Sequence, residues 1–230
     1  MESTDVLVIG SGIAGLCAAI EAARTGATVT VASAGKTMSG SSFFPGTWGL
    51  GLIGPVDEDD EQDLIDTILA VGGGVADPEL VQTFVHGIPQ AIDWLEQDLG
   101  VELQRPQSAK SAQQKQFIPC FDHKTRMWRG LTRKPLEDAL TTWIESLGIR
   151  LLPRHELIDL VEDTNGRVTG TVLYDLTKNR IVPFAAKATI IAAGGTGGLF
   201  ERSLTSADVL SSSQAIALAH GATLTNIEFM

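Results

Sequence analysis

Glycines recur at a fixed spacing near the start of the chain, in the stretch Gly10-Ser11-Gly12-Ile13-Ala14-Gly15. In a G-x-G-x-x-G motif the first glycine permits a tight turn, the second lets a pyrophosphate approach the backbone, and the third lets helix and strand pack closely. The helix that follows offers free N–H groups and a partial positive charge to phosphates. Strands expected before and after this helix favour dinucleotide binding over a glycine-rich turn without a ligand. We predict that all six residues of the motif contact the cofactor.

The position that should contact a ribose holds an unusual residue. A dinucleotide fold usually places an acid about 20 residues after the motif, but this chain has Ser33 there, followed by Ala34. A hydroxyl can bond a ribose, although without the strength that a charge adds. A plain turn at the end of a strand is the alternative. NADP would favour a nearby basic residue, for which Lys36 is the candidate, and NAD is a further possibility against which Ser33 argues.

Two charged segments could also carry function. The acidic run Asp57–Asp63 precedes an apolar pattern, so it suits the positive end of a helix dipole, with a metal site as the alternative. The segment Asp122–Pro135 holds His123, Lys124, Arg126, Arg129, Arg133 and Lys134. Its charge could attract a dicarboxylate or cofactor phosphates. The alternative is a solvated face that balances nearby acids, and no catalytic role is assigned to any of these residues.

Alternating strands and helices must position these residues. Asp5–Ile9, Gly12–Arg24 and Ala27–Ala32 read as a β-α-β unit. Further helices are expected from the acidic run onward, from Asp77-Pro78 with a kink at Pro89, over Pro135–Leu147 and over Ser206–His220. Further strands are expected at Ile149–Leu152, Leu157–Val161, Arg167–Tyr174, Arg180–Phe184 and Ala188–Ala192, and loops over most of Gly40–Pro55 and Gln104–Gln116. The pattern predicts an α/β, Rossmann-like fold with a small β-meander.

Composition narrows the function classes. The chain has 230 residues, of which 17 are basic and 28 acidic, for a formal net charge of -11. Such an acidic surface should repel nucleic acid and anionic membranes. Only Cys17 and Cys120 are present, which favours a reducing cytoplasm over a disulfide framework. No apolar run reaches the ~20 residues of a membrane span, and we expect no signal peptide in the opening MESTDVLVIG.

Four stretches occur in an order typical of one family. VLVIGSGIAGLCAAIEAARTGATVTVASAGK, SGSSFFPGTWG, ATIIAAGGTGG and GATLTNIEFM together resemble the succinate dehydrogenase and fumarate reductase flavoprotein family, which includes L-aspartate oxidase. The resemblance implies a glutathione-reductase-like fold that binds FAD. It places the AMP half of FAD on the Gly10–Gly15 turn and Ser33 near the adenosine ribose, with Ala34 and Lys36 beside it.

The same resemblance implies further flavin contacts. Gly40-Ser41-Ser42 matches a loop that runs along FAD, and Ser41 stands where respiratory members link the flavin to a histidine, so non-covalent FAD is expected. Ala193-Gly194-Gly195 matches glycines at a strand end near the dinucleotide. The glycine pair usual after the loop is broken in Pro45–Gly49, where Trp48 either closes the pocket or is a core aromatic.

The resemblance also implies a reaction, namely hydride transfer from a small carboxylate such as L-aspartate or succinate to flavin N5. Asn226–Met230 resembles the start of a family motif whose histidine lies further on. We therefore expect residues 1–230 to be the N-terminal part of an incomplete FAD-binding domain, without the capping domain or the C-terminal FAD segment. We expect little turnover from it alone, leave the catalytic residues and electron-transfer partner unassigned, and keep an inert FAD- or nucleotide-binding module as the alternative.

Overall fold

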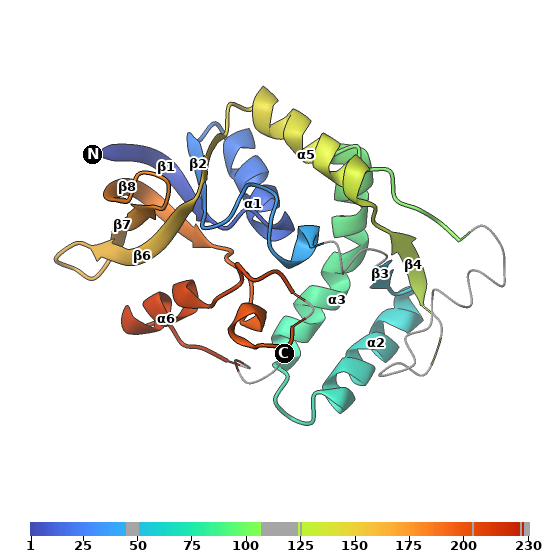
Figure 1. The fold of residues 1–230 in the computed structure, drawn as a ribbon. Helices are drawn as coiled ribbons and strands as arrows, with labels where there is room; N and C mark the ends of the chain where they lie inside the picture. The colour runs from blue at the N-terminus through green and yellow to red at the C-terminus, as the bar shows by residue number, and fades with distance from the viewer. Residues whose placement is uncertain (45–50, 107–123, 125, 204, 226, 228–230) are drawn as a thin grey trace. The chain divides into compact units, whose positions relative to one another are not determined.

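The computed structural model describes residues 1–44, 51–106, 124, 126–203, 205–225 and 227. The chain divides into two compact units, one of Met1–Trp48 with Leu140–Met230 and the other of Gly49–Ala139. The first contains the glycine motif and the large sheet. The second contains the acidic run and the helices that follow it (Figure 1).

The predicted β-α-β unit is confirmed at the start of the first unit. Strand β1 spans Glu2–Ile9, helix α1 spans Ile13–Arg24 and strand β2 spans Val29–Ser33. β1 and β2 pair in parallel. The last three residues of β1 and all of β2 are buried, as expected for parallel strands covered on both faces. Gly26 follows α1 with a φ of +90°, which a glycine adopts without strain.

The sheet of the first unit has six strands in the order β5-β2-β1-β8-β7-β6. The later strands are β5 (Arg150–Pro153), β6 (His155–Glu162), β7 (Val168–Asp175) and β8 (Arg180–Ile191). β6, β7 and β8 form the predicted antiparallel meander. The expectation of separate strands at 180–184 and 188–192 is wrong. β8 is continuous because its first half pairs with β7 and its second half with β1.

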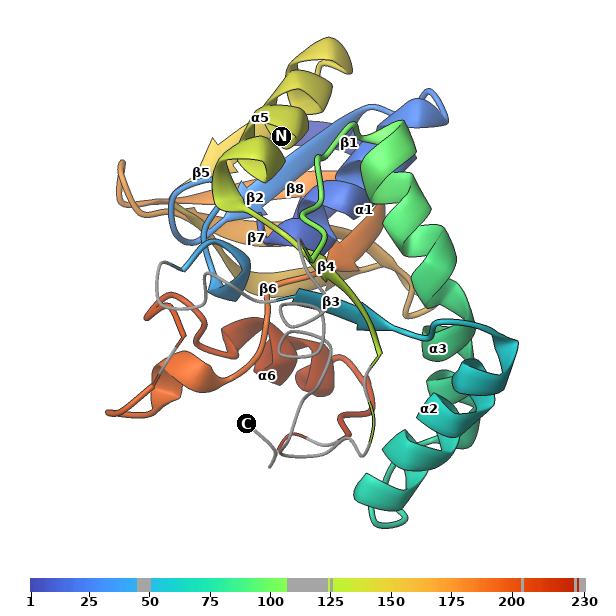
Figure 2. The ribbon, with the colours of Figure 1, turned by 90° about the vertical axis from the view of Figure 1, so that its right-hand side faces the viewer.

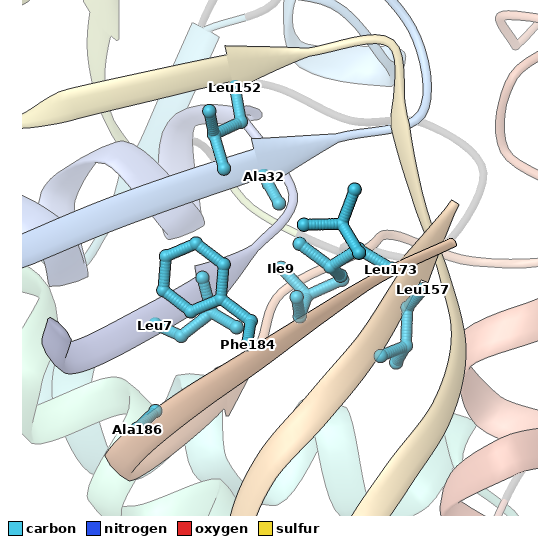
Figure 3. Close-up of a cluster of buried hydrophobic side chains, with 9 residues drawn as sticks. Leu7, Ile9, Ala32, Leu152, Leu157, Leu173, Phe184 and Ala186 are labelled. Carbon is cyan, nitrogen blue, oxygen red and sulfur yellow. The ribbon is translucent and has the colours of Figure 1, made fainter. Parts of the chain in front are cut away.

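A hydrophobic core lies between the parallel strands and the meander. Figure 3 shows side chains from β1, β2 and β5 that point toward side chains from β6, β7 and β8. The members of this cluster are Leu7, Ile9, Ala32, Leu152, Leu157, Leu173, Val182, Phe184 and Ala186. This packing fixes the carboxyl ends of the strands, which are where an open α/β sheet binds its ligands.

The last helix of the first unit is shorter than predicted. The helix expected over 206–220 is α6, which spans only Ser212–Ala219 and contacts β6. The preceding residues form a loop instead, because the N–H of Gly198 bonds the carbonyl of Val209 and the buried Val209 side chain holds the loop inward. Ser211 then has a left-handed φ of 61°, which no helix interior contains.

The second unit combines two helices with a short two-stranded antiparallel sheet. It contains β3 (Gly51–Gly54), α2 (Glu58–Val71), α3 (Pro78–Asp93), the π-helix η3 (Trp94–Asp98) and β4 (Met127–Gly130), and α5 (Arg133–Ser146) begins in it. α2 and α3 lie side by side (Figure 2). The loop expected over 40–55 is wrong at 51–54, where β3 pairs with β4.

An acidic residue caps the start of each of these helices, and the helices predicted to begin at the acidic run and at Asp77-Pro78 are confirmed. The Asp57 carboxylate accepts a hydrogen bond from the N–H of Asp60, and the Asp77 carboxylate accepts from the N–H groups of Glu79 and Leu80. Apolar residues of α3 are buried along one face, whereas Phe84 is 63% exposed. Phe84 is therefore a surface residue of the described structure.

Candidate functional site

A pocket of about 230 Å³ opens at the carboxyl ends of β1, β2 and β8. Two backbone hydrogen bonds hold these ends together, from the N–H of Gly10 to the carbonyl of Ala32 (2.8 Å) and from the N–H of Ala192 to that of Ile9 (2.7 Å). Most of the predicted cofactor residues line this pocket, namely Gly10, Ser11, Gly12, Ala14, Ser33, Ala34, Gly40, Ser41, Ser42, Ala193 and Gly194. The fold thus gathers segments separated by up to about 180 residues of sequence.

Four predicted residues are not part of the pocket wall. Gly15 packs against the turn from behind, and the exposed Lys36 contributes only its carbonyl to the local hydrogen bonds. The N–H of Ile13 bonds the Ser42 hydroxyl at 3.2 Å, and the carbonyl of Gly195 accepts from the Ser211 hydroxyl at 3.3 Å. Lys36, Ile13 and Gly195 therefore support the pocket through backbone hydrogen bonds.

The three glycines of the motif have different surroundings. Gly10 has a φ of +112°, and a Cβ atom there would lie 2.2 Å from the carbonyl oxygen of Ala192. A Cβ atom on Gly15 would lie 2.1 Å from the carbonyl oxygen of Gly10. A Cβ atom on Gly12 would instead meet nothing closer than the Ser42 hydroxyl, at 3.5 Å. Gly10 and Gly15 are required by the fold, whereas Gly12 leaves open the backbone surface that a pyrophosphate needs.

Serine hydroxyls hold the loops around this turn. Ser11 donates to the Ser33 hydroxyl at 3.0 Å, and both side chains are buried. Each also lies 3.4 Å from the carbonyl of Lys36. The short 3-10 helix η1 (Ser41–Phe43) brings Ser42 over the start of α1. Ser33 therefore lines the pocket while its hydroxyl is already engaged with the glycine turn.

Several residues that line the pocket were not predicted from the sequence. They are Gly35, Ser39, His155, Glu156, Asp208, Leu210, Ser211, Ser212 and Ser213. The three serines at the start of α6 could have been found as helix-start residues, but they fell inside the helix predicted over 206–220. His155 Nδ1 lies 2.8 Å from the Pro153 carbonyl, and Nε2 lies 3.8 Å from Asp175. The N–H of Lys178 holds the pKa of Asp175 below its usual range, although burial opposes this.

The basic segment meets acids of its own unit. Lys124 lies 2.6 Å from Asp60, and the fully buried Arg126 contacts both Asp60 and Asp63. Arg133 and Lys134 pair with Glu137 and Asp138, one turn further along α5. These contacts bear out the interpretation of a solvated, charge-balancing face for Lys124, Arg133 and Lys134, whereas the buried Arg126 is not part of a solvated face.

Two residues singled out in the sequence lie outside the described part of the chain. Within that part, the structure shows neither a metal-binding cluster nor a membrane-spanning helix. Trp48 and His123 are outside the described residues. Within the described part of the chain, no group of three or more histidine, cysteine or acidic side chains is arranged to hold a metal ion. Among the helices that the structure describes, none combines the length and apolar character needed to cross a bilayer.

Comparison with known proteins identifies the family. A sequence profile described as "FAD binding domain" matches residues 5–230. The chain belongs to the FAD binding domain family. FAD is accordingly its cofactor, and the pocket fits this assignment because the open backbone at Gly12 lies beside the amino end of α1. The predicted α/β FAD-binding fold and the resemblance to the fumarate reductase flavoproteins are confirmed.

Relatives of this FAD binding domain include an L-aspartate oxidase from Halobacterium salinarum, 34% identical over 244 residues that cover 99% of this chain and 45% of the relative. The 8-methylmenaquinol:fumarate reductase flavoprotein subunit of Wolinella succinogenes is 30% identical, over 87% of this chain and 32% of its own. The open conformation of a flavocytochrome c3 fumarate reductase shares the fold, with a TM-score of 0.78 at 22% identity, over 99% of this chain and 42% of the other. The chain thus spans less than half the length of these relatives.

Proposed function

We propose that the pocket binds the AMP half of FAD, with the pyrophosphate over Gly12 and the amino end of α1. The observation that carries this proposal is the difference between Gly12, where a side chain would have room, and Gly10 and Gly15, where it would not. No lysine or arginine occurs among the described residues that line the pocket. The phosphates must therefore be held by backbone N–H groups and by the helix dipole.

Ser41 leads us to propose that FAD is held without a covalent bond. Ser41 lines the pocket at the position where the family resemblance places a linking histidine. Unfolding the flavin-loaded protein and passing it through a size-exclusion membrane tests this. All of the yellow flavin should appear in the filtrate, whereas flavin retained on the polypeptide would contradict the proposal.

We further propose that a protein containing this chain is an FAD-dependent oxidoreductase acting on a small carboxylate of the L-aspartate or succinate/fumarate type. The relatives, an L-aspartate oxidase and a fumarate reductase flavoprotein subunit, support the substrate class, and the low cysteine content supports the cytoplasm as its location. Bound FAD supplies hydride acceptance or donation. The residues of this chain bind the nucleotide half of FAD at the carboxyl ends of the strands. Substrate binding and proton transfer are not assigned to any described residue.

Two measurements test the proposal. FAD is first titrated into the chain and followed by tryptophan fluorescence and thermal melting, with NAD and NADP as competitors. Saturable FAD binding that excess NAD does not displace is expected, and a preference for NAD would overturn the cofactor assignment. The protein with its downstream sequence is then assayed with L-aspartate, succinate and fumarate. Tight FAD binding without turnover on any of them would favour an inert flavin-binding module.

A further inference from the structure

Asp208 brings a carboxylate to the pocket from the loop before α6. The next residue holds this loop in place, because Val209 is 3% exposed and its carbonyl accepts a hydrogen bond from the N–H of Gly198 at 2.8 Å. Oδ1 of Asp208 is buried and has no hydrogen-bond partner among the described residues. A buried carboxylate oxygen without a donor is costly, so it indicates a donor that the described protein residues do not supply.

Gly35 makes room for this carboxylate. A Cβ atom on Gly35 would lie 2.3 Å from Oδ2 of Asp208, closer than any side chain could tolerate. The backbone of Gly35 lies outside the left-handed region, so the absence of a side chain matters here for space and not for conformation. Asp208 therefore sits directly against the turn that follows β2, on the wall that also contains Ser33 and Ser39.

The end of β2 is where a dinucleotide fold places its ribose-binding acid. In this chain the residue there is Ser33, and its hydroxyl already bonds Ser11. Asp208 reaches the same turn from 175 residues further along the chain, as the residue numbers show. It provides the charge that Ser33 lacks, and it faces a pocket whose described lining has no lysine or arginine to neutralise it.

We infer that the Asp208 carboxylate accepts hydrogen bonds from the ribose hydroxyls of the adenosine half of FAD, in place of an acid at the end of β2. This inference rests on the proposal that the pocket binds that half. A hydroxyl donating to a carboxylate forms a charge-assisted bond, which is about twice as strong as one to a serine hydroxyl. The negative charge also disfavours any nucleotide with a phosphate on the ribose 2′ oxygen.

The test compares FAD with analogues that lack the 2′ or the 3′ hydroxyl of the adenosine ribose. The wild-type chain should bind FAD about 10- to 100-fold more tightly than at least one analogue. In Asp208→Ala this preference should fall to about 1, because the acceptor is gone. A preference that survives in Asp208→Ala, or one that is absent from the wild type, would overturn the inference. Failure of the wild type to bind any of these flavins would instead refute the proposed function.

Two further variants separate binding from folding. Glu201→Ala removes an exposed acid from the same connection between β8 and α6, and it should keep the full preference. Gly35→Ala should displace the carboxylate and lower the preference, yet it should have no further effect in Asp208→Ala, where the obstructing atoms are absent. Because the preference is a ratio within one variant, a general loss of folded protein cannot imitate this pattern. Additive effects of the two substitutions would contradict the inference.

Discussion

Arg126 Nη2 lies 2.7 Å from the carboxylate of Asp63, and no part of the Arg126 side chain reaches solvent. The same guanidinium donates to the carboxylate of Asp60 and, at 3.2 Å, to its carbonyl. Burial raises the pKa of Asp60. The hydrogen bonds from Lys124 and from the N–H of Val56, together with the charge of Arg126, outweigh this effect, so the net shift of the pKa is downward. The acids at the start of α2 thus serve a structural ion-pair cluster as well as the helix dipole.

Arg126→Ala should destabilise the second unit strongly. Removing one partner of a buried ion pair leaves an uncompensated buried charge, which typically costs about 3–5 kcal/mol. Arg105→Ala is the matched control, because Arg105 is 55% exposed and its pair with Glu96 is a surface contact worth at most about 1 kcal/mol. Urea unfolding of both variants measures the difference, and equal losses would contradict the buried role of Arg126.

Substitutions in the glycine motif should affect the stability of the fold and the affinity for FAD separately. Gly15→Ala should lower the free energy of unfolding by about 1–3 kcal/mol, because its methyl group would overlap the Gly10 carbonyl. Gly12→Ala should leave stability nearly unchanged, since its methyl group has ordinary contacts and its φ of -72° suits alanine. FAD affinity should nevertheless fall in Gly12→Ala, because the methyl group blocks the phosphate approach. Denaturant unfolding and FAD titration of both variants check this, and a Gly12→Ala chain with unaltered FAD affinity would contradict the proposed pose.

Sequence alone predicted the elements whose signals are local. The β-α-β unit, the helix start at Asp77-Pro78 and the strands of the meander each depend on residues a few positions apart. The pocket wall at Gly10, Ser11, Gly12 and Ala14 followed from the glycine motif. Local sequence patterns were therefore sufficient to predict most helices and strands and the part of the pocket that the glycine motif forms.

The features that were missed depend on pairings between distant residues. β3 contains two glycines and no long β-branched run, so only its partner β4 reveals it as a strand. The continuity of β8 depends on β1 and β7 together. Asp208 was hidden inside an apolar pattern that reads as helix, and nothing within the sequence indicates that it meets Gly35.

Cys17 should behave as an inert thiol. Burial, followed by the charge of Glu21, raises its pKa to about 12. Because the thiolate is the reactive form, Cys17 in the folded chain should react with a thiol reagent at pH 8 far more slowly than an unfolded peptide thiol. The experiment uses a Cys120→Ser background, since Cys120 lies outside the described residues. Labelling should become fast only in denaturant, and rapid labelling of the native chain would contradict the raised pKa of Cys17.

His220 joins the end of α6 to β6 through two carboxylates. Its Nε2 lies 2.8 Å from Asp159 and its Nδ1 lies 2.6 Å from Glu162, so both ring nitrogens face acceptors. This arrangement requires a protonated ring. The hydrogen bonds to Asp159 and then Glu162 raise the pKa of His220 above its usual 6.5.

The direction of the pH effect follows from this shift. A group whose pKa is raised by folding stabilises the folded state fully below its unfolded pKa, and this stabilisation is lost as pH rises through the folded pKa. Stability should therefore decline as the pH rises above about 6.5, and His220→Gln should remove that part of the decline. Asp159→Asn should reduce it while leaving the Glu162 contact. Urea unfolding across this range, with the His220 ring titrated by NMR, checks the prediction, and an unchanged decline in His220→Gln would show that other groups cause it.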